Sequence, residues 1–104
     1  MEVLSAALND IVNQNAILYS RELEELNNTE LRLLRAVCAG ATQYSSKETM
    51  DKFGLGTSAN VVKTRRSLVS KEIAGEEQGQ LFLLDPVFEL WFRQQVLGEE
   101  LLTT

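Results

Sequence analysis

A run of short helical patterns, a glycine turn and a strand pair predict a mainly α-helical winged helix-turn-helix. This is a helical bundle with a small two-stranded β-wing, here with extra N-terminal and C-terminal helices. Apolar residues recur at spacings of three and four in several segments, as in amphipathic helices. Gly54 and Gly56 form a short turn between two of these segments, as expected between the last two helices of the motif. We expect one domain, divided into an N-terminal helix (1–27), the helix-turn-helix and wing (28–84) and a C-terminal helix (85–98).

The N-terminal segment is expected to be one long amphipathic helix over residues 3–26. The polar run Asn13–Asn15 marks a break or bend in it. Its apolar face is predicted to consist of Leu4, Leu8, Ile11, Val12, Leu18, Leu23 and Leu26.

A strongly apolar helix is expected next, around Leu31–Ala39. Asn28 or Thr29 is predicted to cap it, and Gly40 to end it. Cys38 falls within the apolar pattern. We interpret it as a small core residue rather than a nucleophile, because the chain has no histidine to activate it.

The helices on either side of the glycine turn come next. An extended piece is predicted to contain a half-buried Tyr44, and Ser46 to begin the first of the two helices. Thr57 or Ser58 is predicted to cap the second, which we expect to run to about Glu72.

The helical period predicts which side of this last helix faces outward. Val61, Leu68 and Val69 are its apolar positions, and Thr64 is expected to be half-buried. If Val61, Thr64 and Leu68 point inward, the outward residues are Ser58, Ala59, Val62, Lys63 and Arg66, with Asn60 and Ser67 beside them.

Residues Ile73–Leu84 are predicted to form the wing, a small hairpin around a run of turn formers. The wing carries two acidic residues, Glu76 and Glu77, and no basic residue, so the phosphate backbone of DNA would repel the wing.

Asp85 is expected to cap the last helix and Pro86 to lie in its first turn. The aromatic residues of that helix are interpreted as core: Phe88, Trp91 and Phe92.

Composition excludes several classes of protein. The 104 residues include one cysteine, no histidine, and 10 basic against 15 acidic side chains, a net charge of -5. A disulfide scaffold, a histidine-dependent catalytic triad and a histidine/cysteine zinc site are therefore excluded. We find no signal peptide or membrane span, so we expect a cytoplasmic chain that does not enter a membrane. We expect no enzyme activity and no cofactor.

The charge is unevenly distributed. Residues 1–41 carry three basic and six acidic side chains, residues 42–73 six and three, and residues 74–104 one and six. The net charges are therefore -3, +3 and -5, and the positive charge lies in the helix-turn-helix. The acidic total therefore does not exclude a local basic face.

Four segments carry a resemblance to a known family. They are Thr29–Leu31, Tyr44–Glu48, Gly54–Val61 and Asp85–Arg93, of which the closing Asp-Pro-Val-Phe-Glu-Leu-Trp run is the most specific. Together they resemble the C-terminal winged-helix domain of archaeal- and Bacteroides-type AAA ATPases, over nearly the whole chain. The resemblance implies an ATPase module, and with it ATP, in an upstream part of a longer polypeptide. The present chain has no G-x-x-x-x-G-K-[ST] phosphate loop, so nucleotide binding is not carried over.

Three functions remain open. The first is a non-catalytic domain that binds double-stranded DNA. In it, Lys63 and Arg66 contact phosphate or guanine, Asn60 pairs with adenine and Lys47 contacts a backbone phosphate; Ala59 and Val62 suit a thymine methyl or a protein partner equally well. The second is a protein–protein module that docks on the ATPase domain or on a partner protein and uses its acidic surface to do so. The third is a dimeric transcription regulator, although the sequence does not define the oligomeric state. The DNA-binding candidates are Lys47, Ser58, Asn60, Lys63 and Arg66.

Overall fold

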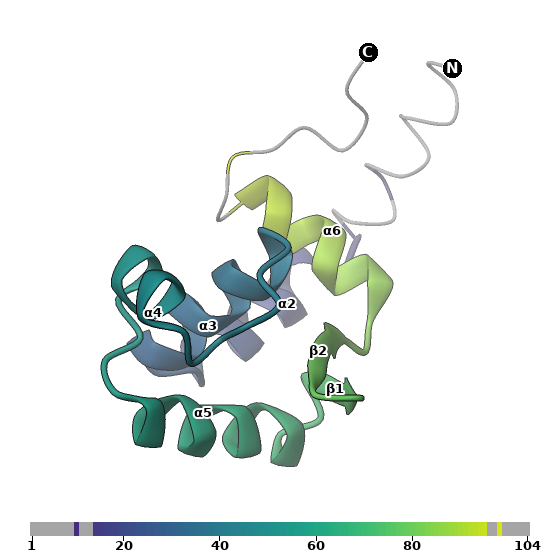
Figure 1. The fold of residues 1–104 in the computed structure, drawn as a ribbon. Helices are drawn as coiled ribbons and strands as arrows, with labels where there is room; N and C mark the ends of the chain where they lie inside the picture. Colours follow the sequence, from purple (N-terminus) through teal and green to yellow (C-terminus); the bar gives the residue numbers. More distant parts are fainter. Residues whose placement is uncertain (1–9, 11–13, 96–97, 99–104) are drawn as a thin grey trace. The chain divides into compact units, whose positions relative to one another are not determined.

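The structure is a computed structural model that describes residues 10, 14–95 and 98. Two compact units divide the chain: one takes the described residues up to Glu25 and from Asp85 onward, and the other is Leu26–Leu84. The elements, labelled in Figure 1, are α2 (Ala16–Glu24), α3 (Asn28–Cys38), α4 (Lys47–Phe53), α5 (Ser58–Ser70), β1 (Ala74–Glu77), β2 (Gln80–Leu83) and α6 (Pro86–Gln95).

The Leu26–Leu84 unit has the predicted winged helix-turn-helix order. Helix α3 contacts both α4 and α5, and α5 contacts β1. In Figure 1 the ribbon of α5 leads directly into the two strands of the wing. The core of this unit is apolar, with Cys38 among its buried side chains as predicted. Its other buried apolar residues are Leu26, Leu33, Leu34, Ala36, Tyr44, Leu55, Val61, Leu68, Ala74, Leu81 and Leu83.

Asn27 caps α3, so the prediction of Asn28 or Thr29 was wrong. The side chain of Asn27 accepts a 2.8 Å hydrogen bond from the Glu30 N–H, and Glu30 Oε1 accepts one of 2.9 Å from the Asn27 N–H. This reciprocal pair is a capping box, which requires an acceptor three residues after the cap. Only Asn27 has Glu30 at that distance, and Asn28 and Thr29 lie inside the helix.

Helix α4 starts close to the predicted position, with Ser46 as its cap and Lys47 as its first residue, whereas Tyr44 differs from its prediction. Tyr44 lies in a turn rather than an extended piece, and it is buried rather than half-buried, with 3% of its surface exposed. Its hydroxyl accepts a 2.9 Å hydrogen bond from the Leu81 N–H of the wing. A polar group can be buried because this partner satisfies it.

The turn between α4 and α5 requires its first glycine. Gly54 ends α4 with a φ of 67°, in the left-handed region that favours glycine. Thr57 then caps α5, where its hydroxyl oxygen accepts from the Asn60 N–H at 3.2 Å.

Helix α5 ends at Ser70 rather than near Glu72, which adopts a left-handed φ of 60° after the helix. Two burial predictions on α5 were wrong. Thr64 is buried rather than half-buried, because its hydroxyl donates to the Asn60 carbonyl at 2.7 Å and needs no water. Val69 is 39% exposed, since Leu68 already occupies the inward direction one residue earlier.

The wing is an antiparallel hairpin closed by Gln78 and Gly79, both at positive φ. A two-residue loop of this kind matches the twist of the strands. Phe82 lies opposite Gly75, where a Cβ would come within 2.5 Å of the Phe82 ring. Gly75 therefore allows the exposed ring to lie across the neighbouring strand.

The other unit contains α2 and α6, which pack against each other. Tyr19 of α2 lies 5.3 Å from Phe88 and 5.7 Å from Trp91 between ring centroids. Phe88, Trp91 and Phe92 are all buried, as predicted.

Asp85 caps α6 as predicted, accepting from the Val87 N–H at 2.9 Å. It also accepts a 3.2 Å bond from the Tyr19 hydroxyl. Burial first, and then the charge of Asp85 and its hydrogen bond, raise the pKa of Tyr19 to about 12.

The predicted N-terminal helix is confirmed only in part. Helix α2 begins after Asn15, which agrees with a break at Asn13–Asn15. Leu18 is 59% exposed, so its place on the apolar face was wrong; the neighbouring Tyr19 points inward instead. Four predicted positions lie outside the described residues, namely Leu4, Leu8, Ile11 and Val12.

Candidate nucleic-acid interface

Helix α5 presents the face that its period predicts. Val61, Thr64 and Leu68 are buried against the rest of the unit. The opposite side of the helix is therefore exposed, and Val62 retains 44% of its surface. All the residues predicted to face outward are exposed: Ser58, Ala59, Val62, Lys63 and Arg66.

Asn60, the flanking candidate, is half-buried and braces the turn before the helix. Its Nδ2 donates to the Leu55 carbonyl at 3.3 Å, and it lies 3.2 Å from the place where a Cβ of Gly56 would be. One of the two N–H groups of its amide is therefore engaged inside the protein, which fixes the orientation of the side chain.

Arg65 ties the wing to α5. It donates to Glu76 Oε1 at 2.8 Å and to the Gly79 carbonyl at 3.0 Å. Its guanidinium also lies 5.3 Å from the centroid of the Tyr44 ring. Because Tyr44 in turn bonds to Leu81 of β2, both strands are held to the helical part of the unit.

Lys71 is engaged at the other end of the helix. Its Nζ lies 3.0 Å from Glu30 Oε1, and Ser67 Oγ donates to Glu30 Oε2 at 2.7 Å. Glu30 is fully buried, so its charge requires these donors. Burial on its own raises the pKa of Glu30. The bonds from Asn27, Ser67 and Lys71 outweigh burial, so the pKa lies below its ordinary value of 4.5.

The basic residues of the helix-turn-helix therefore fall into two groups. Arg65 and Lys71 are bound to acidic side chains of the protein. Lys63 and Arg66 are exposed and have no hydrogen-bond or ion-pair partner among the residues that the structure describes. Lys47 is also exposed, as the first residue of α4.

The prediction from sequence overlooked Glu30 and Arg65. The spacing of Asn27 and Glu30 was the available signal for Glu30, since it is typical of a capping box. The helical period places Arg66, but not Arg65, on the outward side of the helix, yet no local pattern identifies the partners of Arg65. Those partners depend on where the wing folds back.

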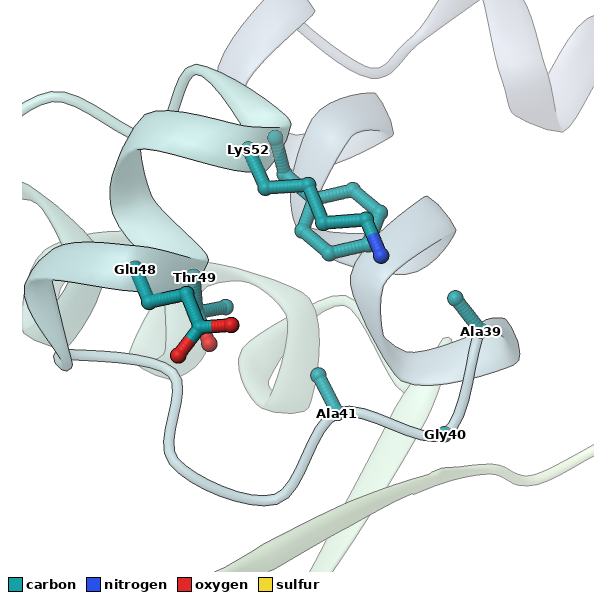
Figure 2. A pocket seen from close by; sticks show the side chains of 7 residues that line it. Ala39, Gly40, Ala41, Glu48, Thr49 and Lys52 are labelled. Atoms are coloured by element: carbon teal, nitrogen blue, oxygen red, sulfur yellow. The ribbon is translucent and has the colours of Figure 1, made fainter.

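Hollows in the described part of this unit include the following two. One, of about 280 Å³, lies between α5 and the wing and is lined by Val62, Arg65, Arg66 and Glu76. The other, of about 170 Å³, is shown in Figure 2 between the loop at Ala39–Ala41 and α4. Its charged groups are Glu48 and Lys52, one turn apart on α4, and the Lys52 Nζ lies 5.6 Å from the centroid of the Phe53 ring. The first hollow is the one that adjoins the candidate residues.

Among the described residues, no group of three histidine, cysteine, aspartate or glutamate side chains could hold a metal ion. No helix in this part of the chain is long and apolar enough to span a membrane.

Comparison with known proteins agrees with the fold. Residues 17–94 match a family model described as a probable winged helix domain, and the chain belongs to this family. No curated protein and no solved structure matches the chain.

Proposed function

We propose that the chain is a non-catalytic, DNA-binding accessory domain that uses α5 as its recognition helix. The observation that carries the proposal is the outward face of α5. It exposes Lys63 and Arg66, which form no ion pair within the described residues, while Arg65 and Lys71 of the same region are bound to Glu76 and Glu30. Cations held on an exposed helix of a winged-helix fold suit the major groove of double-stranded DNA.

Each candidate has a role in this proposal. Arg66 reaches a guanine edge or a phosphate, and Lys63 a phosphate. Ser58, at the start of α5, is short enough to let the helix approach the groove closely. Lys47 adds a phosphate contact from α4, and Asn60 contributes chiefly by holding the turn in place.

The wing is expected to contribute little affinity. Glu76 is compensated by Arg65, but Glu77 is exposed on the wing and repels phosphate. Affinity therefore depends on a few contacts from α5, and we expect it to be low and to fall steeply with salt.

The larger context is also a proposal. Because Asp85–Arg93 and three other segments resemble the C-terminal domain of AAA ATPases, we propose that this domain follows such a module in a longer cytoplasmic polypeptide. ATP would bind to that module, and this domain takes no cofactor of its own. A G-x-x-x-x-G-K-[ST] loop encoded upstream in the same reading frame would support the proposal, and an upstream region without one would contradict it.

The DNA-binding proposal is tested by fluorescence anisotropy with a mixed-sequence duplex at low salt. We expect the wild-type chain to bind, and the double variant Lys63→Glu, Arg66→Glu to lose binding. A matched control, Arg35→Glu with Lys52→Glu, changes the net charge equally on exposed residues of α3 and α4. Failure of the wild type to bind, or equal loss in both variants, would contradict the proposal.

A protein-docking function is the second candidate, and exposed apolar side chains favour it. Val62 and Val69 are exposed two turns apart on α5, and Phe82 and Leu84 are exposed on the wing and just after it. In this case we expect binding to the upstream ATPase module at physiological salt without DNA. Val62→Asp with Val69→Asp should then abolish that binding.

A further inference from the structure

Val62 is an exposed apolar residue on the DNA-facing side of α5, near its N-terminal end. It lies between the small Ala59, one turn earlier, and Arg66, one turn later, and Lys63 adjoins it. Both cations are exposed, so an apolar side chain with 44% of its surface in water sits among the proposed phosphate and guanine contacts. An apolar side chain makes no favourable contact with a phosphate, whereas a base edge in the major groove can carry an apolar methyl group.

There is room for a base edge beside Val62. The hollow of about 280 Å³ between α5 and the wing has Val62 as its apolar wall and Arg66 beside it. Glu76, on the wing side of the hollow, is bound to Arg65 at 2.8 Å, so its negative charge is compensated within the protein. A group that enters here meets a branched apolar side chain and a guanidinium donor.

We propose that Val62 reads the C5 methyl group of a thymine in the major groove, next to the guanine or phosphate bound by Arg66. The thymine methyl is the one apolar group on the base edges of this groove, and small apolar side chains recognise it by contact. This inference rests on the proposed DNA-binding function and deepens it: the domain would prefer certain sequences instead of binding duplexes through phosphates alone.

Position along the helix separates Val62 from Val69. Seven residues place Val69 on nearly the same side but about 10 Å further toward the C-terminal end of α5. The N-terminal residues of a recognition helix are the ones that contact base edges. Val69 is therefore the matched control: it is similarly exposed, on the same helix, and outside the proposed base contact.

The experiment begins with selection of duplexes bound by the full chain at low salt from a randomised pool. Each thymine of the enriched sequence is then replaced by uracil, which removes only the methyl group and leaves the protein unchanged. At one position we expect uracil to weaken wild-type binding about four-fold, the value for one buried methyl group. The same replacement should weaken binding by Val62→Ala clearly less, because the alanine methyl is shorter, while Val69→Ala should respond as the wild type does.

Each other outcome is informative. Enrichment without any effect of uracil, or an equal effect on wild type and Val62→Ala, would overturn the inference and leave DNA binding itself intact. Loss of the uracil effect in Val69→Ala alone would assign the contact to the other end of the helix and would also overturn it. Binding without any enriched sequence would mean that phosphates alone are read, and absence of binding would refute the proposed function as well.

Discussion

Arg65 and Arg66 are neighbours in the sequence and have opposite surroundings. Arg65 bonds to Glu76 and to the Gly79 carbonyl and lies over the Tyr44 ring, so its charge holds the wing in place. Arg66 is exposed and has no such partner within the described residues. A count of basic residues treats the two alike, yet only one is available to an external anion. The same division separates Lys71, bound to Glu30, from Lys63.

The largest effect is expected from the residue that engages Lys71. Replacing Glu30 by Ala removes the acceptor for Lys71, Ser67 and the Asn27 N–H, and we expect the free energy of unfolding to fall by about 3 kcal/mol. Urea unfolding followed by circular dichroism measures it. Glu77→Ala, at an exposed position of the wing, is the control and should change stability by less than about 0.5 kcal/mol. Equal effects of the two variants would mean that the hydrogen bonds and the ion pair of Glu30 stabilise the fold no more than an exposed glutamate does.

Replacing the exposed pair Lys63 and Arg66 should weaken DNA binding and leave the stability of the fold nearly unchanged. For Lys63→Ala with Arg66→Ala we expect a loss of about 2 kcal/mol in DNA affinity, roughly thirtyfold, because the contacts to phosphate and guanine disappear. The slope of log affinity against log salt should also become shallower by about 2. Titrations at several salt concentrations measure both quantities. The free energy of unfolding should stay within about 0.5 kcal/mol of wild type. A larger loss would mean that these two residues stabilise the fold, as Arg65 and Lys71 do.

The two neighbouring arginines provide the most direct test of the comparison. We expect Arg65→Ala to lower the free energy of unfolding by about 1 kcal/mol, since a partly exposed ion pair, a hydrogen bond and a ring contact are lost together. Arg66→Ala should be nearly neutral in the same urea experiment. If both variants were equally stable, the wing would not depend on Arg65.

The smallest effect concerns pH. Burial raises the pKa of Glu30. The hydrogen bonds that it accepts and the charge of Lys71 lower the pKa by more, so the pKa lies below 4.5. Its contribution to stability is therefore complete above that pH and is lost as the pH falls through the lower pKa of the folded chain. We expect the loss of stability between neutral pH and about pH 3 to be larger for wild type than for Glu30→Gln. Urea midpoints at the two pH values measure it, and identical losses would contradict the lowered pKa.

Local pattern was sufficient for much of the fold. The spacing of Val61 and Leu68 predicts the buried side of α5, and the structure exposes the residues expected on the other side. Asp85 caps its helix as predicted, Thr57 is the cap among the two predicted candidates Thr57 and Ser58, and Ser46 lies at the predicted start of its helix, because a cap bonds to a residue two or three positions away. The prediction failed at the cap of α3, which is Asn27 and not Asn28 or Thr29. It also failed at Val69, which is exposed because its neighbour Leu68 takes the inward direction.

The sequence by itself determined the winged helix-turn-helix and the outward face of α5, because periodicity and capping act over a few residues. Only the tertiary structure decided which partners engage the other basic residues of this region, Arg65 and Lys71. Lys71 meets Glu30 across 41 positions, and Tyr44 meets Leu81 across 37, so no local pattern encodes these partners. A buried charge needs donors, and these come from wherever the chain folds together. Folding thus occupies Arg65 and Lys71 and leaves Lys63 and Arg66 exposed.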